Sequence, residues 1–315
     1  MSLKKILKQS LITSWRYKYL WFFGLFAALL GSNNEFEILS GSLTGEIKQG
    51  YFLDYQQIIE KIFSRDTISG ISKIITEDPL SLILLVVIGL VILTLFLFLV
   101  WLTIVSQAAL VNNSSQIIKG KDHSFQAGTT SGINNFWPVF ALNIISKIVI
   151  FLTFGLLGLS VIVTNKPIYL ITFIILIPIA VIFSFIIKYA VAYVVIYGSR
   201  LLDSFKSGWR LFVSYWIISI KMALLLFIIT LLVGFILVII IANLNTIFTF
   251  LTVVFAKSLP AVGFWLFVVI RSLFAFLLII LVGTFLTTWQ ITAWTNLFLK
   301  LVNGIGNKKT TVVKK

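Results

Sequence analysis

The sequence has no cysteine and only one histidine among its 315 residues. Disulfides, thiolate catalysis, zinc sites and haem ligation therefore have almost nothing to be built from, and we expect no metal, no cofactor and no enzymatic activity. Charged residues are also scarce, at 11%, whereas an average soluble domain has about 25%. Hydrophobic residues make up 59%, and the mean hydropathy is +1.08. This composition excludes a soluble globular protein and predicts an all-α, polytopic membrane protein.

Long apolar runs without charge predict the membrane spans, because about 20 helical residues cross ~30 Å of hydrocarbon. Five runs are long enough: Leu80–Val105, Ile148–Thr164, Tyr169–Ile187, Met222–Ala242 and Ser272–Gln290. A sixth run, Tyr19–Gly31, has only 13 residues, so we expect it to recruit Trp15–Lys18 and to span over about residues 15–31. The sequence thus predicts a bundle of about six transmembrane helices. The segment Thr246–Lys257 is too short to cross, and we expect it to be an external interfacial helix.

The first 18 residues have a pattern of their own. Apolar residues recur at helical spacing on one face, with lysines elsewhere: Leu3, Ile6, Leu7, Leu11 and Trp15 against Lys4, Lys5 and Lys8. This pattern predicts that residues 1–18 form an amphipathic helix in the headgroup region. A secretory signal peptide is the alternative, because basic residues precede a short apolar run. The aromatic and basic belt at residues 15–21 favours a permanent helix.

The distribution of charge predicts the orientation. With six spans, 18 of the 25 lysine and arginine residues fall on the side that holds both termini, and the positive-inside rule makes that side cytoplasmic. Eight of the ten acidic residues lie in the loop of residues 32–78, which becomes external. Residues 19–300 then form the six-span domain in the plasma membrane, and residues 301–315 form a basic cytoplasmic tail. Orientation and attraction to anionic lipid explain the net charge of +15, so no nucleic-acid partner is needed.

A weak internal repeat marks the cytoplasmic side. The stretch Ser204-Phe205-Lys206-Ser207-Gly208 matches Ser124-Phe125-Gln126-Ala127-Gly128, and aromatic residues, one lysine and a long apolar run follow each copy. Ser10 precedes Trp15-Arg16 at the spacing that separates Ser204 from Trp209-Arg210, which is a fainter third copy. We expect each unit to be an interfacial lead-in helix followed by a span, with the serine or the aspartate before it as the helix cap.

The repeated lead-in, together with the opening LKQSLITSWRYKYLWFFGLFAALLG, resembles a group of uncharacterised prokaryotic six-span proteins. These look related to the membrane domain attached to some glycerophosphoryl diester phosphodiesterases. The resemblance would cover nearly the whole chain, and its motifs are short and non-catalytic. It implies a helical membrane bundle without the catalytic phosphodiesterase barrel.

Three lysines at the cytoplasmic ends of the predicted spans are the candidate site residues: Lys147, Lys188 and Lys221. No predicted span contains an acidic partner for them. They can anchor the helices by extending to the membrane surface, which we favour. The alternative is a site for lipid phosphate between spans three, four and five. His123, beside Asp122 in a polar loop, is expected to be solvated rather than catalytic.

Pro178, inside the fourth span, is expected to kink that helix. Four glycines in the spans are expected to allow close helix approach: Gly155, Gly158, Gly234 and Gly283. We therefore expect a non-enzymatic membrane protein that acts as a scaffold or as a module interacting with anionic phospholipid. The alternative is a transporter of small molecules or lipids, with a site near Pro178 and the three lysines.

Overall fold

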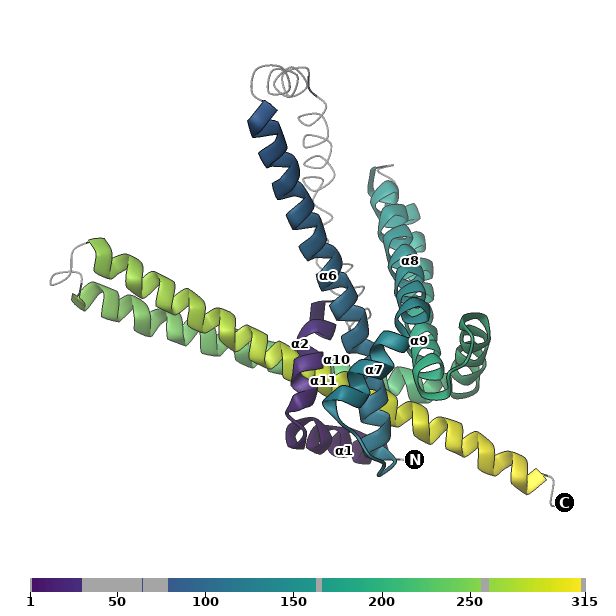
Figure 1. Cartoon of the computed structure of the whole chain (residues 1–315). Helices are drawn as coiled ribbons and strands as arrows, with labels where there is room; N and C mark the ends of the chain where they lie inside the picture. The colour runs from purple at the N-terminus through teal and green to yellow at the C-terminus, as the bar shows by residue number, and fades with distance from the viewer. Residues whose placement is uncertain (1, 30–63, 65–78, 163–165, 256–260, 313–315) are drawn as a thin grey trace. The chain divides into compact units, whose positions relative to one another are not determined.

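The computed structural model describes residues 2–29, 64, 79–162, 166–255 and 261–312. Every regular element in these ranges is an α-helix (Figure 1): α1 (Leu3–Arg16), α2 (Tyr19–Leu29), α6 (Pro79–Ile118), α7 (Phe125–Asn134), α8 (Phe136–Ile162), α9 (Lys166–Tyr197), α10 (Leu201–Phe255) and α11 (Ala261–Val312). Five of them, α6 and α8–α11, contain segments long and apolar enough to cross a membrane. The predicted all-α fold is confirmed, and the chain is a multi-pass membrane protein. The predicted external loop, residues 32–78, lies outside the described residues apart from Ser64.

Each of the five long predicted runs falls on one of these five helices, with only residues 163–164 of the second run outside the described ranges. The helices extend well beyond the runs, because polar residues continue them at one end. The segment Thr246–Lys257 differs from its prediction. Up to Phe255 it continues α10 rather than forming a separate interfacial helix, since no proline interrupts the chain before Pro260.

The sixth predicted span is divided. The helix ends at Arg16, Tyr17 has a non-helical backbone, and α2 begins at Tyr19. The indole Nε1 of Trp21 donates to the carbonyl of Ser14 at 2.8 Å, which satisfies one of the last carbonyls of α1. Trp15 and Arg16 therefore end α1, Tyr17 and Lys18 form a corner, and none of them lengthens α2, whose 11 residues rise by about 16 Å.

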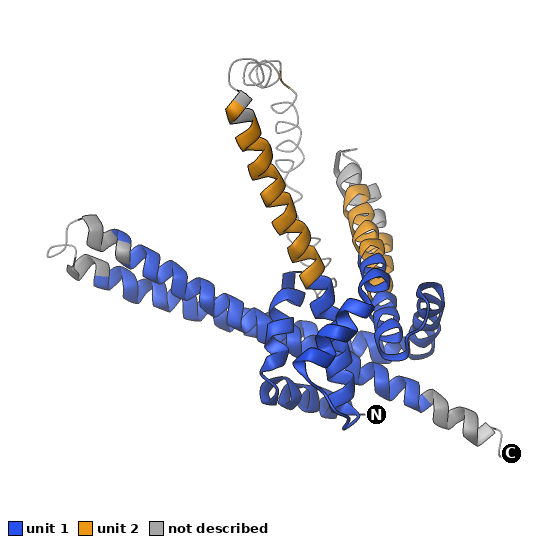
Figure 2. Ribbon diagram, in the orientation of Figure 1, with its two compact units in different colours: residues 1–32, 103–143, 185–315 blue, residues 33–102, 144–184 orange. Residues whose placement is uncertain are grey.

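The described chain divides into two compact units (Figure 2). Unit 1 comprises Met1–Ser32, Thr103–Asn143 and Phe185–Lys315, and unit 2 comprises Asn33–Leu102 and Ile144–Ser184. In unit 2, α8 and α9 pack through a small apolar core of Ile150, Ile177 and Ala180. The unit 2 part of α6 exposes large apolar side chains along its length, from Leu80 to Leu99, as expected of a helix that faces lipid.

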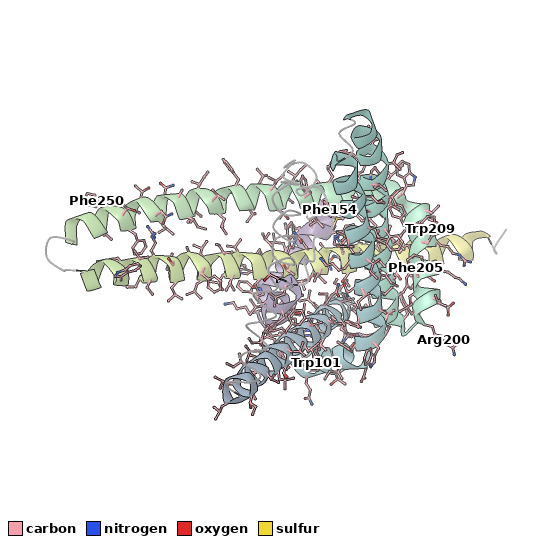
Figure 3. All side chains as sticks on the ribbon, turned by 90° about the horizontal axis from the view of Figure 1, so that it is seen from above. Trp101, Phe154, Arg200, Phe205, Trp209 and Phe250 are labelled. Atoms are coloured by element: carbon pink, nitrogen blue, oxygen red, sulfur yellow. The ribbon has the colours of Figure 1, made fainter. Side chains whose placement is uncertain are left out.

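In unit 1, α10 and α11 run side by side as an antiparallel pair, and α1 and α2 pack against α11 (Figure 1). Figure 3 shows Phe250 near one end of α10 and Arg200, Phe205 and Trp209 toward the other. Large apolar residues on the pair are mostly exposed toward the Phe250 end, whereas the buried core of α11 lies at Trp289–Leu301.

Close helix contacts in unit 1 depend on glycines that sequence analysis did not single out. A Cβ on Gly24 of α2 would overlap the Thr288 hydroxyl of α11, and a Cβ on Gly132 of α7 would overlap the backbone of Val105 on α6. Gly128 and Gly208 lie equally close to neighbouring helices. Three of the predicted span glycines show no close approach within the described part of the chain, where a Cβ would meet nothing within 4 Å: Gly155, Gly234 and Gly283.

The two copies of the repeat that begin at Ser124 and Ser204 share a break in the helix. The backbone leaves helical geometry at Asn135, between α7 and α8, and at Tyr215, inside α10. Each break comes eleven residues after the serine of its copy, Ser124 or Ser204. In the N-terminal copy the break comes at Tyr17, only seven residues after Ser10. The lead-in helix followed by a second helix is therefore a structural repeat in two of the three copies.

The predicted capping role holds in one copy only. Ser124 caps α7, since its Oγ accepts from the Ala127 N–H at 3.0 Å. Ser204 lies inside α10, and its Oγ donates to the Ser199 carbonyl. Ser10 lies in the middle of α1. Both of these serines are fully buried, so they serve helix packing, which admits small residues where helices approach closely.

Candidate functional site

A buried polar face runs along α11 in unit 1. Thr284, Thr288, Thr292 and Asn296 recur every four residues and are at most 5% exposed, so they share one side of the helix. The Thr292 hydroxyl pairs with the Ser114 hydroxyl of α6 at 2.9 Å. Small polar residues that bond across helices are typical of packing in membranes. This face is what holds the polar ends of the helices together.

Helix α1 docks on this polar face by its hydroxyl side. The Asn296 Nδ2 group donates to the Ser10 hydroxyl and to the Gln9 side-chain oxygen, both at 3.3 Å. The Trp289 indole donates to the Leu7 carbonyl at 3.2 Å. The side of α1 that packs is therefore its small-residue side, with these residues buried: Ile6, Ser10, Thr13 and Ser14.

The opposite side of α1 is exposed and combines charge with apolar surface. Leu11, Ile12 and Trp15 are 44%, 52% and 60% exposed, and the lysines on α1 are exposed as well: Lys4, Lys5 and Lys8. Helix α1 is thus present, but Leu11 shares its exposed side with the lysines, and the partly exposed Trp15 ring also contacts the rings of Trp21 and Phe285, at 5.8 and 5.6 Å between centroids. Because α1 docks through its hydroxyl groups, its exposed apolar side chains remain available to contact lipid.

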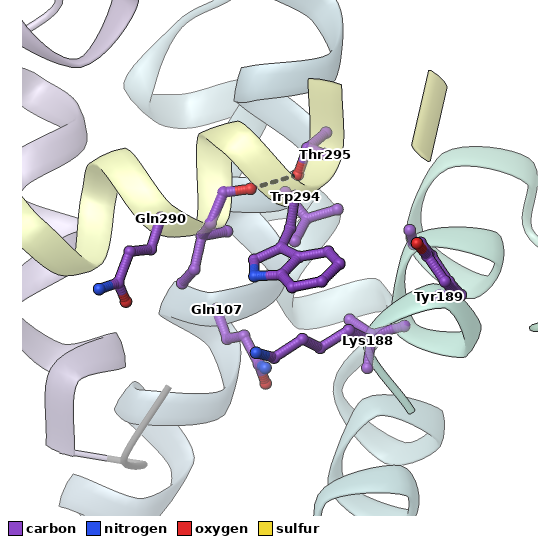
Figure 4. Close-up of a pocket in the computed structure, with 10 residues that line it drawn as sticks. Gln107, Lys188, Tyr189, Gln290, Trp294 and Thr295 are labelled. Atoms are coloured by element: carbon purple, nitrogen blue, oxygen red, sulfur yellow. Dashed lines mark hydrogen bonds between the residues drawn. The ribbon is translucent and has the colours of Figure 1, made fainter. Parts of the chain in front are cut away.

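A small, partly open cavity of about 50 Å³, with a mostly apolar lining and a few polar groups, lies between α6, α9 and α11 (Figure 4). All of its lining residues belong to unit 1: Gln107, Val111, Lys188, Tyr189, Val191, Ala192, Gln290, Ile291, Trp294 and Thr295. Three of them stand at the ends of predicted apolar runs: Gln107 is two residues beyond Val105, Lys188 directly follows Ile187, and Gln290 ends the last run. The cavity therefore lies where three of the predicted apolar runs end.

Lys188 is the charged group of the cavity. Its Nζ lies 4.8 Å from the centre of the Trp294 ring, and Figure 4 shows the lysine side chain extended along that ring. A cation over an indole face is attracted by the ring quadrupole, by about 0.5–2 kcal/mol. The Trp294 ring in turn contacts Phe185, at 5.5 Å between centroids. The charge is thus held in place by aromatic packing.

Two glutamines supply the neutral polar groups. Gln290 is only 3% exposed. Its Nε2 donates to the Thr230 hydroxyl at 2.7 Å, whereas its Oε1 has no partner among the described residues. The Gln107 Oε1 accepts from Asn143 at 2.7 Å, which leaves the amide nitrogen of Gln107 as its donor end. The cavity is thus lined by an ammonium and an amide donor, and the Gln290 side chain beside them carries a buried acceptor without a described partner.

The predicted site residues are not all in this place. Lys188 lines the cavity, but Lys221 is exposed on α10 and is not among the lining residues. Lys147 is half-buried on α8 in unit 2. Pro178 lies within α9, also in unit 2, and is exposed; the kink there stays a prediction. The site formed by all three lysines together likewise stays a prediction.

His123 is not simply solvated, as the sequence suggested. Its Nδ1 pairs with the Tyr19 hydroxyl at 2.9 Å, and its ring meets that of Tyr17 edge to face at 4.6 Å. The histidine therefore links the loop before α7 to the corner between α1 and α2. In the same segment between α6 and α7, burial and the positive charge of Lys121 lower the pKa of Lys119.

Sequence reasoning missed Gln107, Gln290 and Trp294, because polar residues at the end of an apolar run were read only as its boundary. A signal was present in TTWQITAWTN at residues 287–296. Gln290 and Trp294 are four residues apart in this stretch, which places both on one helical face.

Comparisons of the chain with family models, with curated proteins and with solved structures found no match. The resemblance to the membrane domain of glycerophosphoryl diester phosphodiesterases therefore stays a prediction. The geometry of the chain itself carries the functional argument.

Proposed function

We propose that this integral membrane protein is a non-enzymatic module that interacts with anionic phospholipid at the cytoplasmic face of the plasma membrane. The exposed side of α1 carries the proposal. Lysines on that side attract anionic headgroups, by about 1 kcal/mol per basic residue near the surface. Leu11, Ile12 and Trp15 offer apolar area to the acyl boundary. An interfacial helix of this kind, bonded to α11 through Asn296, couples the lipid surface to the bundle.

The position of α1 supports placing both termini on one side. Leu7 and Ser10 bond to Trp289 and Asn296, at the end of the last predicted span. If α1 lies at the cytoplasmic surface, the C-terminal end of that span lies there too. An even number of crossings is then required, and since the long described helices supply five, the sixth crossing needs residues beyond the 11 of α2.

The test measures lipid preference around the embedded protein. Spin-labelled phosphatidylglycerol and phosphatidylcholine report the fraction of each lipid that the protein immobilises. We expect wild type to prefer phosphatidylglycerol and K4Q/K5Q/K8Q to reduce that preference by on the order of a hundredfold, since three basic residues at about 1 kcal/mol each are lost. High salt should reduce the wild-type preference in the same way.

Arg271→Gln is the matched control, because the predicted orientation places Arg271 at the external end of its span. It should leave the preference at the wild-type value. An unchanged preference in K4Q/K5Q/K8Q would overturn the proposed role of α1.

A further inference from the structure

We propose that the cavity between α6, α9 and α11 is a binding site for a phosphate ester that carries its own hydroxyl or ammonium donor. This inference rests on the proposed function and assigns a specific site to one lipid headgroup, distinct from the exposed surface of α1. The chemistry follows from the three polar groups of the lining and from where they stand in the membrane.

The anionic half of the ligand is defined by Lys188. Its ammonium is held over the Trp294 ring at 4.8 Å, so little side-chain freedom is lost when an anion binds. The amide nitrogen of Gln107 adds a neutral donor, because the oxygen of that amide is occupied by Asn143. An ammonium and an amide donor on one cavity suit the oxygens of a phosphate.

The donor half is defined by Gln290. Its Oε1 has no partner in the described part of the chain, although the side chain is almost fully buried. A buried acceptor without a hydrogen bond costs about 1–3 kcal/mol, and an O–H or N–H group of the ligand would recover that cost. A bare phosphate diester lacks such a group, whereas the glycerol or ethanolamine part of a headgroup has one.

The volume of the cavity and the position of its lining residues favour binding of a lipid headgroup rather than of a whole lipid molecule. A volume of about 50 Å³ accommodates roughly three to five groups the size of a water molecule, which matches a phosphate and one neighbouring polar group. The lining residues Gln107, Lys188 and Gln290 lie at the ends of apolar runs, at the depth where headgroups are found. The acyl chains would remain outside the cavity, in the bilayer.

Native mass spectrometry of the full chain tests this site. The detergent-purified protein is incubated with equal amounts of phosphatidylglycerol, phosphatidylethanolamine and phosphatidylcholine, and the lipids retained are counted. Wild type should retain one phosphatidylglycerol or phosphatidylethanolamine at least tenfold better than phosphatidylcholine, whose headgroup has no O–H or N–H donor. Lys188→Gln should lower retention of that lipid at least tenfold. Gln290→Leu should remove the preference over phosphatidylcholine.

Two control variants separate the site from general effects. Lys221→Gln removes an exposed lysine that does not line the cavity, and it should retain lipid as wild type does. Thr230→Val removes the same Thr230–Gln290 hydrogen bond as Gln290→Leu but leaves the Oε1 acceptor, so it should keep the preference. If Gln290→Leu unfolds, Gln290→Met tests the same acceptor.

The source of the phosphate ester is distinguished by adding glycerol 3-phosphate and phosphoethanolamine without lipid. Binding of either that is lost in Lys188→Gln would identify a soluble ligand at the proposed site, whereas displacement by lipid alone identifies the headgroup. Retention unchanged in both Lys188→Gln and Gln290→Leu would overturn the site. Since K4Q/K5Q/K8Q leaves the cavity intact, it should keep the one retained lipid even if the lipid preference of the surrounding bilayer is lost, so the two proposals can fail separately.

Discussion

The contact between α2 and α11 predicts that Gly24→Ala destabilises the protein, although alanine is the better helix former. A Cβ at this position would overlap the Thr288 hydroxyl and lie 2.8 Å from the Thr284 carbonyl oxygen. Carbon and oxygen atoms in such contacts are ordinarily about 3.3–3.6 Å apart, so α2 must move away by about 0.5–0.8 Å. The carbonyl belongs to the backbone of α11 and cannot rotate aside.

The expected loss follows from two opposing terms. Overpacking of a close contact costs about 1–3 kcal/mol, and the gain in helix propensity from glycine to alanine is at most about 1 kcal/mol. We expect a net loss of about 1–2 kcal/mol, seen as a fall of a few degrees in the thermal unfolding midpoint in detergent. Thr288→Ala in the same chain should restore only part of it, because the Thr284 carbonyl remains.

Gly234→Ala is the matched control, since nothing lies within 4 Å of a Cβ at that position on α10. It should be neutral or slightly stabilising. Equal effects at Gly24 and Gly234, or complete rescue of Gly24→Ala by Thr288→Ala, would refute the proposed approach of α2 to α11.

Two further predictions concern unit 1. The chain has no cysteine, and the Ser114 and Thr292 hydroxyls lie 2.9 Å apart, so S114C/T292C should form a disulfide on mild oxidation. The disulfide is detected by loss of free thiol relative to either single variant. Unreacted thiols would contradict the contact between α6 and α11. Asn296→Leu removes two hydrogen bonds to α1, each worth about 0.5–1.5 kcal/mol. Trypsin should therefore cleave after the exposed basic residues of α1 roughly 5–150-fold faster than in wild type, while an unchanged rate would mean that these bonds do not hold α1.

The spans could be predicted from sequence because burial in lipid requires only length and the absence of charge. Each of the five long runs lies on its own helix for that reason. The corner at Tyr17 could not be predicted, since it depends on Trp21 reaching back to the Ser14 carbonyl. From the sequence alone, the aromatic residues at positions 15–21 were interpreted as a belt at the membrane surface.

Of the three lysines predicted as site residues, only Lys188 lines the cavity. Lys188 was found because charge beside an apolar run is conspicuous, but its neighbours Gln290 and Trp294 come from a helix about 100 residues further along the chain. The close-approach glycines show the same limit. Gly24 and Gly234 look alike in sequence, and only the neighbouring helix distinguishes them.

The docking of α1 on α11 also has a consequence for synthesis of the chain. Ser10 and its partner Asn296 are separated by 286 residues, and at about 5–20 residues per second a ribosome needs about 15–60 s to make the second after the first. During that interval the hydroxyl face of α1 waits at the membrane without its partner. The first helix made is thus among the last to gain its partners on α11. A chain cut short before Trp289 would lack the hydrogen bonds from α11 to Leu7, Gln9 and Ser10, and the lysine-bearing side of α1 would lose that support.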